Sequence, residues 1–356
     1  MPALRIFILR KDMYKKWSLR DLKAVPQNGY KVFSLFSCGG GSTMGYKLAG
    51  YDVIGNCEID GQICSIYRKN HNPTYSFNMD IREFLQLGDG CIPKELFGLD
   101  VLDGSPPCSV FSMSGNREKD WGKSKVFREG QSEQTLDDLF FEYVRAVGRL
   151  KPKVFIAENV KGLLYGNAKG YVAEILKRFR AIGYKVQLFS LNAALMGVPQ
   201  RRERVFFIGC RSDMGFPNLK LGFNGLPICF GDVKSKEGKA VTMNCMDLLK
   251  QKMPTDRKLS DIYKRLYGKE SCFNTILVWD DIVAPTITAK GQLIRANDDS
   301  AFSDEDYIAC QSFPYDYDFC GADVKYICGM SVPPYMMKGI AEAVAAQWLS
   351  KQGCNR

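Results

Sequence analysis

The sequence predicts an α/β fold in which a doubly wound, Rossmann-like sheet is joined to a second, smaller and irregular domain. Short apolar segments alternate with amphipathic ones over about 180 residues, as expected for parallel strands connected by helices. The first of these units contains a glycine-rich turn and ends on an acidic residue. After Cys210 the alternation stops, and Gly, Pro, Lys and Asn become frequent.

The first unit begins at residue 32. We expect an apolar strand at residues 32–36, a glycine-rich turn at residues 37–41 and a helix at residues 42–49 that Gly50 closes. A second strand starts at Tyr51 and ends near Glu58. An acidic side chain at that strand end is typical of a nucleotide-binding βαβ unit.

Later segments continue the alternation and define the expected domains. Further strands are predicted at residues 99–103, 154–157, 185–191 and 205–209, and helices at residues 137–150, 171–182 and 339–349. The prediction is a larger ligand-binding domain at residues 1–209 plus 325–356, and a small domain at residues 210–324.

Composition narrows the functional classes. A formal charge of +10 and a pI near 8.9 are compatible with a polyanionic partner. The 13 cysteines include no Cys-x-x-Cys pair, so we expect no metal site. Neither a signal peptide nor a membrane-spanning apolar run is present, which predicts a cytoplasmic protein with no membrane partner.

Only one histidine is present, His71. This argues against Ser-His-Asp hydrolases, Cys-His proteases and histidine-rich metal sites. It stands in the polar stretch at residues 69–73, and we expect it to be exposed in a surface loop.

The glycine turn lacks the spacing that binds a pyrophosphate. Gly39, Gly41 and Gly45 fit G-x-G-x-x-x-G and not G-x-G-x-x-G. A wider turn suits a ligand without phosphates, such as the methionine part of S-adenosylmethionine. Glu58 can accept hydrogen bonds from ribose hydroxyls, and Asp80 can accept one from an adenine amino group.

A candidate nucleophile follows the strand that ends at Asp103. Two prolines, Pro106 and Pro107, stiffen the backbone directly before Cys108. In an open α/β sheet, that end of a strand faces the ligand crevice. A cysteine held there is suited to nucleophilic attack when nearby positive charge favours its thiolate.

Two further polar clusters adjoin predicted strands. Glu158 comes directly after the strand at residues 154–157, which places it at the same sheet edge as Cys108. Arg202 and Arg204 precede the strand at residues 205–209, and in extended backbone they point to one side. We therefore expect a thiol, a carboxylate and two guanidiniums at one edge of the sheet.

These motifs together resemble those of the bacterial-type, S-adenosylmethionine-dependent DNA cytosine carbon-5 methyltransferases. The central motifs occur in that family's order and at compatible spacing. The first cofactor motif corresponds to residues 36–45, the late motifs correspond to residues 284–288, 311–314 and 329–334, and the resemblance spans about residues 32–349. The central motifs are Ser105-Pro-Pro-Cys-Ser-Val-Phe-Ser112, Glu158-Asn-Val160 and Gln200-Arg-Arg-Glu-Arg204.

The resemblance implies S-adenosyl-L-methionine as the cofactor, bound by the larger, catalytic domain. Three positions depart from the family pattern. Cys38 replaces the first glycine of the turn, Ser109 replaces a common glutamine, and Met330 replaces an asparagine. The expected cofactor contacts are Phe36, Ser37, Cys38, Gly39, Gly40, Gly41, Glu58, Ile59, Asp80, Ile81, Ser105, Met330 and Ser331.

The resemblance also implies a reaction. The target cytosine is flipped out of the duplex, and the thiolate of Cys108 adds to its carbon-6, so that carbon-5 takes the methyl group. Glu158 would bind the ring nitrogen and the amino group, Arg202 would hold the base oxygen, and Arg204 would help orient the site.

Double-stranded DNA is the expected substrate. A loop at residues 112–134 would close over it, and the small domain, chiefly residues 211–285, would recognise the target sequence. The shortness of this region favours a bacterial-type enzyme. We further expect a monomer in a bacterial or phage-infected cell, with a cognate restriction endonuclease as a second partner. The loop's basic residues are Arg117, Lys119, Lys123, Lys125 and Arg128.

Three alternatives stay open at the level of sequence. A transfer RNA cytosine methyltransferase would use the same scaffold. A catalytically silent DNA-binding relative is disfavoured because Cys108, Glu158 and Arg202 are all present. A nicotinamide dehydrogenase is disfavoured by the wide glycine turn and the scarcity of histidine.

Overall fold

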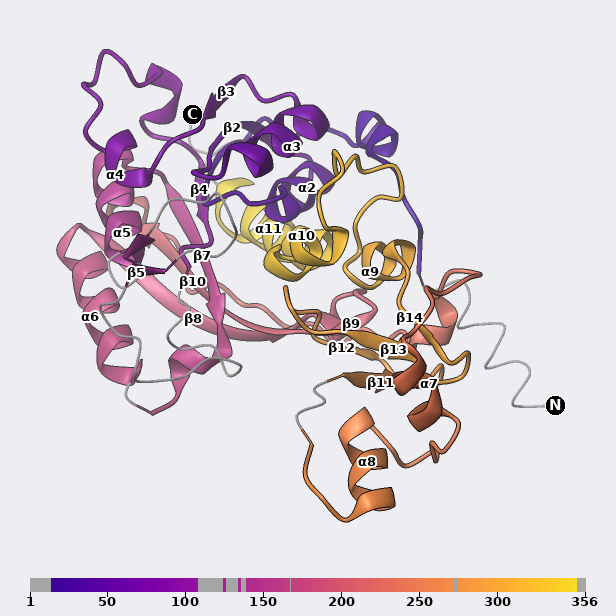
Figure 1. Cartoon of the computed structure of the whole chain (residues 1–356). Coiled ribbons are helices and arrows are strands. Elements are labelled where there is room, and N and C mark those ends of the chain that lie inside the picture. Colours follow the sequence, from indigo (N-terminus) through magenta and orange to yellow (C-terminus); the bar gives the residue numbers. More distant parts are fainter. Residues whose placement is uncertain are drawn as a thin grey trace. The chain divides into compact units, whose positions relative to one another are not determined.

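In the computed structural model, the alternating apolar segments form a seven-stranded sheet in the larger of two units (Figure 1). The strand order is β3-β2-β1-β4-β7-β10-β8. All the pairs from β3 to β7 are parallel, whereas β10 runs antiparallel to β7. The strands are β1 (Lys31–Leu35), β2 (Asp52–Cys57), β3 (Tyr75–Phe77), β4 (Val101–Gly104), β7 (Val154–Val160), β8 (Tyr184–Asn192) and β10 (Glu203–Arg211).

The strand order reverses beside β1. From β1 the chain builds β2 and β3 on one side, and then continues with β4 and β7 on the other. Such a switch point opens a crevice outside the carboxyl ends of the strands. The predicted doubly wound, Rossmann-like fold is therefore confirmed, and its switch point lies between β1 and β4.

Helices cover both faces of this sheet. Alternating side chains of β4 show this directly, because Asp103 meets Tyr46 of α2 while Gly104 meets the Tyr143 ring of α5. A Cβ atom on Gly104 would lie 2.3 Å from that ring, so only glycine fits there. The helices are α2 (Gly41–Leu48), α3 (Gly61–His71), α4 (Ile81–Phe84), α5 (Leu139–Leu150), α6 (Ala168–Ala181) and α11 (Pro334–Gln347).

Aromatic side chains fill the core between the sheet and the helices α5 and α6. The rings of Phe155 and Phe179 stack with centroids 4.0 Å apart, and Phe140 and Phe207 pack edge to face at 5.0 Å. All four side chains are buried. Burial of this area is the main stabilising contribution to the larger unit, and it holds the strand ends in place.

The smaller unit contains more regular structure than the sequence predicts. It has a small core of its own, formed by residues such as Leu259, Ile262, Leu277 and Ile294. Its strands are β9 (Gln200–Arg201), β11 (Ile276–Val278), β12 (Ala284–Pro285), β13 (Leu293–Arg295) and β14 (Ser300–Ala301), and its helices are α7 (Met243–Leu249), α8 (Leu259–Tyr267), α9 (Asp304–Cys310) and α10 (Val324–Met330).

The structure describes residues 14–107, 124–125, 134–135, 139–166, 168–271 and 275–350. The smaller unit takes its described residues from Met1–Asp21, Asn192–Arg202 and Phe223–Met336, and the larger unit takes the rest. These bounds differ from the expected ones at residues 1–21, 192–202, 210–222 and 325–336. In the described part of the chain, every helix falls short of the length and apolar character needed to cross a membrane.

Candidate active site

Four neighbouring strands of the larger unit share one row of paired residues, at which β1, β2 and β4 end while β7 continues to Val160. Leu35 pairs with Cys57 on one side and with Gly104 on the other, and Gly104 pairs with Ala157. The residue that follows each of these positions is one that the sequence predicts for the site. The register therefore brings Phe36, Glu58, Ser105 and Glu158 to a single edge of the sheet.

A pocket at this edge collects five of the predicted cofactor residues. Phe36, Glu58, Ile59, Asp80 and Ile81 line it. Its walls are apolar apart from the two acids, a combination that suits an aromatic base joined to a hydroxyl-bearing sugar. The sequence analysis missed three further lining residues, which are Cys57, Met79 and Leu139.

Both acids of the pocket also hold the backbone. Glu58 accepts hydrogen bonds from the backbone N–H groups of Cys38 at 2.9 Å and Asp60 at 3.1 Å. Burial raises the pKa of Glu58 above its ordinary value, and these N–H donors offset part of that rise. Asp80 caps α4 and forms an ion pair with Arg82 at 3.1 Å. Each carboxylate keeps further acceptor positions for a ligand.

The turn after β1 has strained backbone at two positions that are not glycine. Phe36 has a φ of 53° and Cys38 a φ of 44°, both in the left-handed region. Side chains with a Cβ atom pay about 1–2 kcal/mol for this conformation. The strain explains why glycine suits position 38, and it is concentrated at the sheet edge that carries the pocket.

His71 is buried, so the prediction of an exposed loop histidine was wrong. It is the last residue of α3, its side chain is 5% exposed, and its ring lies 4.6 Å from that of Tyr67. A Cβ atom on Gly40 would lie 2.1 Å from His71 Nε2. Burial lowers the pKa of His71 to about 3, so a neutral imidazole supports the glycine turn from below.

A hydrogen bond ties the Glu158 motif to the proline turn. Asn159 is buried and donates through Nδ2 to the carbonyl oxygen of Pro106 at 3.0 Å. The bond fixes the chain two residues before Cys108. Cys108 itself, Ser109 and most of the predicted loop at residues 112–134 lie outside the described residues; only the short strands β5 (Ser124–Lys125) and β6 (Gln134–Thr135) are described there.

Glu158 forms its ion pair with Arg204. Arg204 Nε lies 2.8 Å from Glu158 Oε1, and the two side chains are 14% and 12% exposed. The pair bridges β7 and β10, where Glu158 is opposite Phe206 and Val160 is opposite Arg204. Burial lowers the pKa of Arg204 from its ordinary value, and the charge of Glu158 opposes that effect. A guanidinium and a carboxylate thus meet on β7, the strand whose Asn159 bonds to Pro106.

Arg202 belongs to the smaller unit and has a different environment. Its side chain is 2% exposed. It donates through Nη1 to the carbonyl oxygen of Ile287 at 3.1 Å, and through Nη2 to that of Gly329 at 2.9 Å. These bonds join the chain ahead of β10 to two of the late motifs, which is a structural role for Arg202.

A buried amide network organises the late motifs of the smaller unit. Gln200 accepts a hydrogen bond from the backbone N–H of Ile287 at 3.0 Å and donates to Gln311 Oε1 at 2.6 Å. Gln311 in turn donates to the carbonyl oxygen of Ser331 at 2.7 Å. Of the two cofactor residues predicted here, Ser331 is buried and Met330 is 42% exposed.

The sequence analysis also missed Asp103, a carboxylate buried behind the proline turn. It is 2% exposed and accepts hydrogen bonds from Ser34 Oγ at 2.7 Å and Tyr46 OH at 3.3 Å. Burial raises its pKa to about 7, which these hydrogen bonds only partly oppose.

Comparisons with known proteins agree with this geometry. The family model for C-5 cytosine-specific DNA methylases matches residues 30–346. Type II methyltransferase M.FnuDI of Fusobacterium nucleatum is 34% identical over 63% of this chain and 57% of its own length. Type II methyltransferase M.NgoPII of Neisseria gonorrhoeae is 35% identical over 52% of this chain and 50% of its own. The matches thus span about half of these two relatives.

A longer match, to Type II methyltransferase M.NgoFVII of Neisseria gonorrhoeae, is 28% identical over 89% of this chain and 87% of that protein. Among solved structures, a DNA modification methyltransferase encoded within an E. coli prophage aligns with a TM-score of 0.67 and 18% identity. That alignment covers 90% of this chain and 99% of the other, and at such identity it shows the fold. Because the family model covers most of the sequence, the chain belongs to the C-5 cytosine-specific DNA methylase family.

Proposed function

We propose that the protein transfers a methyl group from S-adenosylmethionine to carbon-5 of a cytosine in a specific double-stranded DNA sequence. The observation that carries the proposal is the Glu158–Arg204 ion pair at 2.8 Å, beside the 3.0 Å bond from Asn159 to Pro106. Because Asn159 follows Glu158 in β7, these contacts support a site in which an acid and a guanidinium act near the turn that leads into Cys108. Such a set of groups can bind a pyrimidine ring edge while a thiolate attacks it.

The described residues of the pocket enclose only about 20 Å³, and their chemistry suits parts of the cofactor. The apolar side chains of Phe36, Ile59 and Ile81 can enclose an adenine ring, while Glu58 and Asp80 can accept hydrogen bonds from the ribose hydroxyls and the adenine amino group. When bound, S-adenosylmethionine supplies an electrophilic methyl group. His71 fills the space that a Cβ atom on Gly40 would need, and so supports the turn that follows β1.

Cys108 is the proposed nucleophile. Its thiolate forms a bond to carbon-6 of the flipped cytosine, and the displaced electron pair makes carbon-5 nucleophilic. After carbon-5 has gained the methyl group, loss of its proton and of the thiolate restores the aromatic ring. Glu158 would hydrogen-bond the ring nitrogen and the amino group, and so stabilise the charge that develops on the ring.

Arg204, not Arg202, is the proposed contact to the base oxygen. Arg204 is partly exposed, pairs with Glu158 and donates to one backbone carbonyl oxygen, that of Glu203, whereas the buried guanidinium of Arg202 donates to two. A base bound by Glu158 would therefore find Arg204 beside it. In this proposal, Arg202 holds the late motifs together.

Methyl transfer from labelled S-adenosylmethionine to duplex DNA tests the function. Cys108→Ser should abolish turnover, and Glu158→Gln should reduce it by about 10³-fold, a typical size for a lost charge-stabilising contact. Glu203→Gln is the matched control. Glu203 is an exposed acid at the start of β10, the strand that pairs with β7, and it forms an ion pair with Lys161. Full activity of Cys108→Ser would refute the scheme.

The acceptor is tested in the same assay with transfer RNA in place of DNA. We expect transfer to duplex DNA only, in line with the names of the relatives. Bisulfite sequencing of DNA from expressing cells would then give the recognition sequence. For the proposed cognate restriction endonuclease, methylated plasmid should resist cleavage by an enzyme that cuts that sequence.

A further inference from the structure

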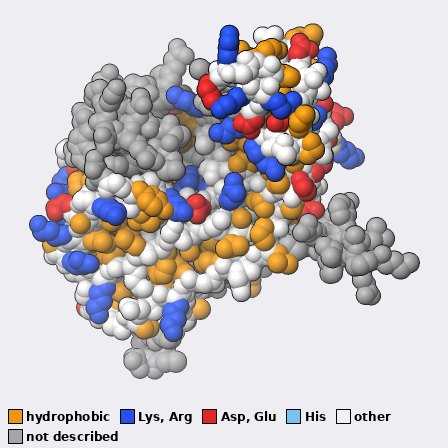
Figure 2. Space-filling view, turned by 90° about the horizontal axis from the view of Figure 1, so that it is seen from below, with side chains coloured by type: hydrophobic (Ala, Val, Ile, Leu, Met, Phe, Trp, Pro, Cys, Tyr) orange, Lys and Arg blue, Asp and Glu red, His pale blue; other side chains and the backbone are white. Residues whose placement is uncertain are grey.

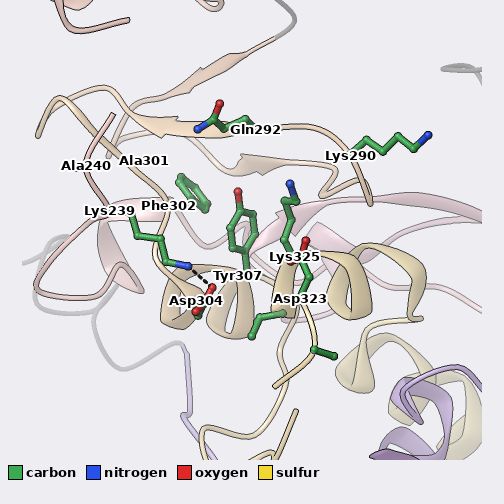
Figure 3. A pocket seen from close by; sticks show the side chains of 12 residues that line it. Lys239, Ala240, Lys290, Gln292, Ala301, Phe302, Asp304, Tyr307, Asp323 and Lys325 are labelled. Carbon is green, nitrogen blue, oxygen red and sulfur yellow. Dashed lines mark hydrogen bonds and ion pairs between the residues drawn. The ribbon is translucent and has the colours of Figure 1, made fainter. Parts of the chain in front are cut away.

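We propose that a groove in the smaller unit binds the phosphate backbone of the DNA substrate, and that Gln292 contacts a base edge beside it. The groove has a volume of about 530 Å³. It lies between the segment that carries Lys290 and Gln292 and the first turns of α9 and α10 (Figure 3). The inference rests on the proposed function, because it names where the same substrate is held.

The charges that line the groove do not cancel. Asp304 is neutralised by Lys239, whose Nζ lies 2.6 Å from a carboxylate oxygen. Asp323 caps α10 by accepting a hydrogen bond from the backbone N–H of Tyr326 at 3.2 Å. Lys290 and Lys325 form no ion pair with any residue that the structure describes. Three lysines against two aspartates leave the lining of the groove with a net charge of +1, which favours an anionic ligand.

This local excess is more informative than the overall charge of +10. Figure 2 shows Lys and Arg side chains scattered among acidic and hydrophobic ones on the face drawn, without one continuous basic patch. Isolated surface lysines of that kind are normally solvated. Lys290 and Lys325, in contrast, line one groove, so a single polyanion can meet both.

Two neutral polar groups accompany the lysines. Gln292 is exposed, and its amide makes no hydrogen bond within the described part of the chain. Tyr307 points into the groove in Figure 3, but it is only 5% exposed and its hydroxyl already has a hydrogen bond with the backbone of Leu293, so it forms part of the groove wall. A glutamine amide both donates and accepts, which allows it to pair with an adenine edge in the major groove. Two lysines beside a glutamine amide therefore suit DNA better than they suit a free anion.

Anisotropy titrations with a labelled duplex that carries the methylated sequence test the backbone contact. The full-length double variant Lys290→Ala/Lys325→Ala should bind DNA about 10- to 100-fold more weakly at physiological salt. The slope of log affinity against log salt should become less negative by about 1.8, because each phosphate contact contributes about 0.9. Thermal melting should be unchanged, since Lys290 is exposed and Lys325 half-buried.

The matched control is Lys94→Ala/Lys185→Ala, which removes two exposed lysines from the larger unit. It should keep the wild-type affinity and salt slope. An unchanged slope in the groove variant would overturn the backbone proposal while leaving the methyltransferase assignment intact. Loss of transfer RNA binding with unchanged DNA binding would also overturn it, because the groove would then serve RNA.

Gln292→Ala tests the base contact separately. Bisulfite sequencing should show relaxed selectivity at one position of the recognition sequence, by about 1–3 kcal/mol or roughly 5- to 150-fold, with the salt slope unaltered. An unchanged recognition sequence would remove Gln292 from the proposal. If the wild type transfers no methyl group, the proposed function fails, but the salt slopes still decide whether the groove binds DNA.

Discussion

Two carboxylate–guanidinium pairs, one in each unit, differ in what surrounds them. Glu158 and Arg204 meet at the sheet edge of the larger unit, with side chains 12% and 14% exposed. Arg295 and Asp306 meet in the smaller unit, at 1% and 0% exposure. Both oxygens of Asp306 also accept backbone N–H bonds, from Ser235 and Ser303, each at 2.8 Å.

The difference indicates different roles. A buried pair whose hydrogen-bonding positions are used by the protein has nothing left for a ligand, so it stabilises the fold. A pair at a strand end, partly open to solvent, can exchange one partner for a substrate. The same two side-chain types therefore serve structure in one unit and, in our proposal, catalysis in the other.

The largest expected effect comes from breaking the buried pair. Arg295→Ala should destabilise the protein by about 3–5 kcal/mol, because Asp306 would keep an uncompensated charge out of water. Denaturant unfolding measures the loss. The control is Arg295→Met/Asp306→Asn, which removes both charges but keeps an amide oxygen for one of the two backbone N–H donors, and it should recover part of the stability. A loss below about 1 kcal/mol for Arg295→Ala would show that the two pairs do not differ as argued.

Breaking the other pair should affect activity much more than stability. Arg204→Ala should lower kcat by about 10²–10³-fold, the usual cost of removing one charge-stabilising donor, with about 1 kcal/mol lost from the free energy of unfolding. The control is Arg201→Ala, which truncates an exposed arginine at the end of β9. Steady-state kinetics and melting on the same samples separate the two effects. Equal activity of the two variants would contradict a substrate contact at Arg204.

Asp103 sharpens the comparison, because it is a buried carboxylate with no cationic partner among the described residues. Its folded pKa, about 7, lies above the ordinary value of 3.8. The stability that protonated Asp103 contributes is therefore fully present below pH about 4. It is lost as the pH rises through about 7, where the carboxyl group must ionise in the folded state as well. Asp103→Asn should remove this dependence. Between pH about 5 and 8, wild type should lose of the order of 1–3 kcal/mol more than the variant. Parallel stability profiles would contradict the buried charge.

Much of the sheet edge follows from sequence, because strand ends can be read from apolar runs. Strands at residues 32–36 and 154–157 were predicted close to β1 and β7, and their register then places Phe36 and Glu158 in one row. The surroundings of individual side chains were not predicted correctly. His71 looks exposed in its polar stretch, yet α3 extends through it and turns its ring under Gly40. That contact joins residues about 30 positions apart, which no local pattern encodes.

The two arginines show the same limit. Alternation along extended backbone correctly makes Arg201 and Glu203 exposed, and Arg202 and Arg204 more buried. It does not reveal that Arg202 bonds to Gly329 while Arg204 bonds to Glu158, because those partners come from distant segments. The motif indicates which residue types are present, and only the tertiary structure assigns their partners.

The smallest expected effect concerns backbone strain at the sheet edge that carries the pocket. Cys38 has a φ of 44°, and its backbone N–H donates to Glu58, so the bond holds the strained residue in place. Cys38→Gly should raise the free energy of unfolding by about 1 kcal/mol through relief of the left-handed strain, less the added entropy of the unfolded chain. Cys38→Ala keeps the Cβ atom and should show no gain, which makes the difference between the two variants the quantity to measure. Because the Glu58 bond involves only backbone at position 38, the glycine variant should keep the wild-type KM for S-adenosylmethionine. Equal stability of the glycine and alanine variants would mean that the turn is not strained at Cys38.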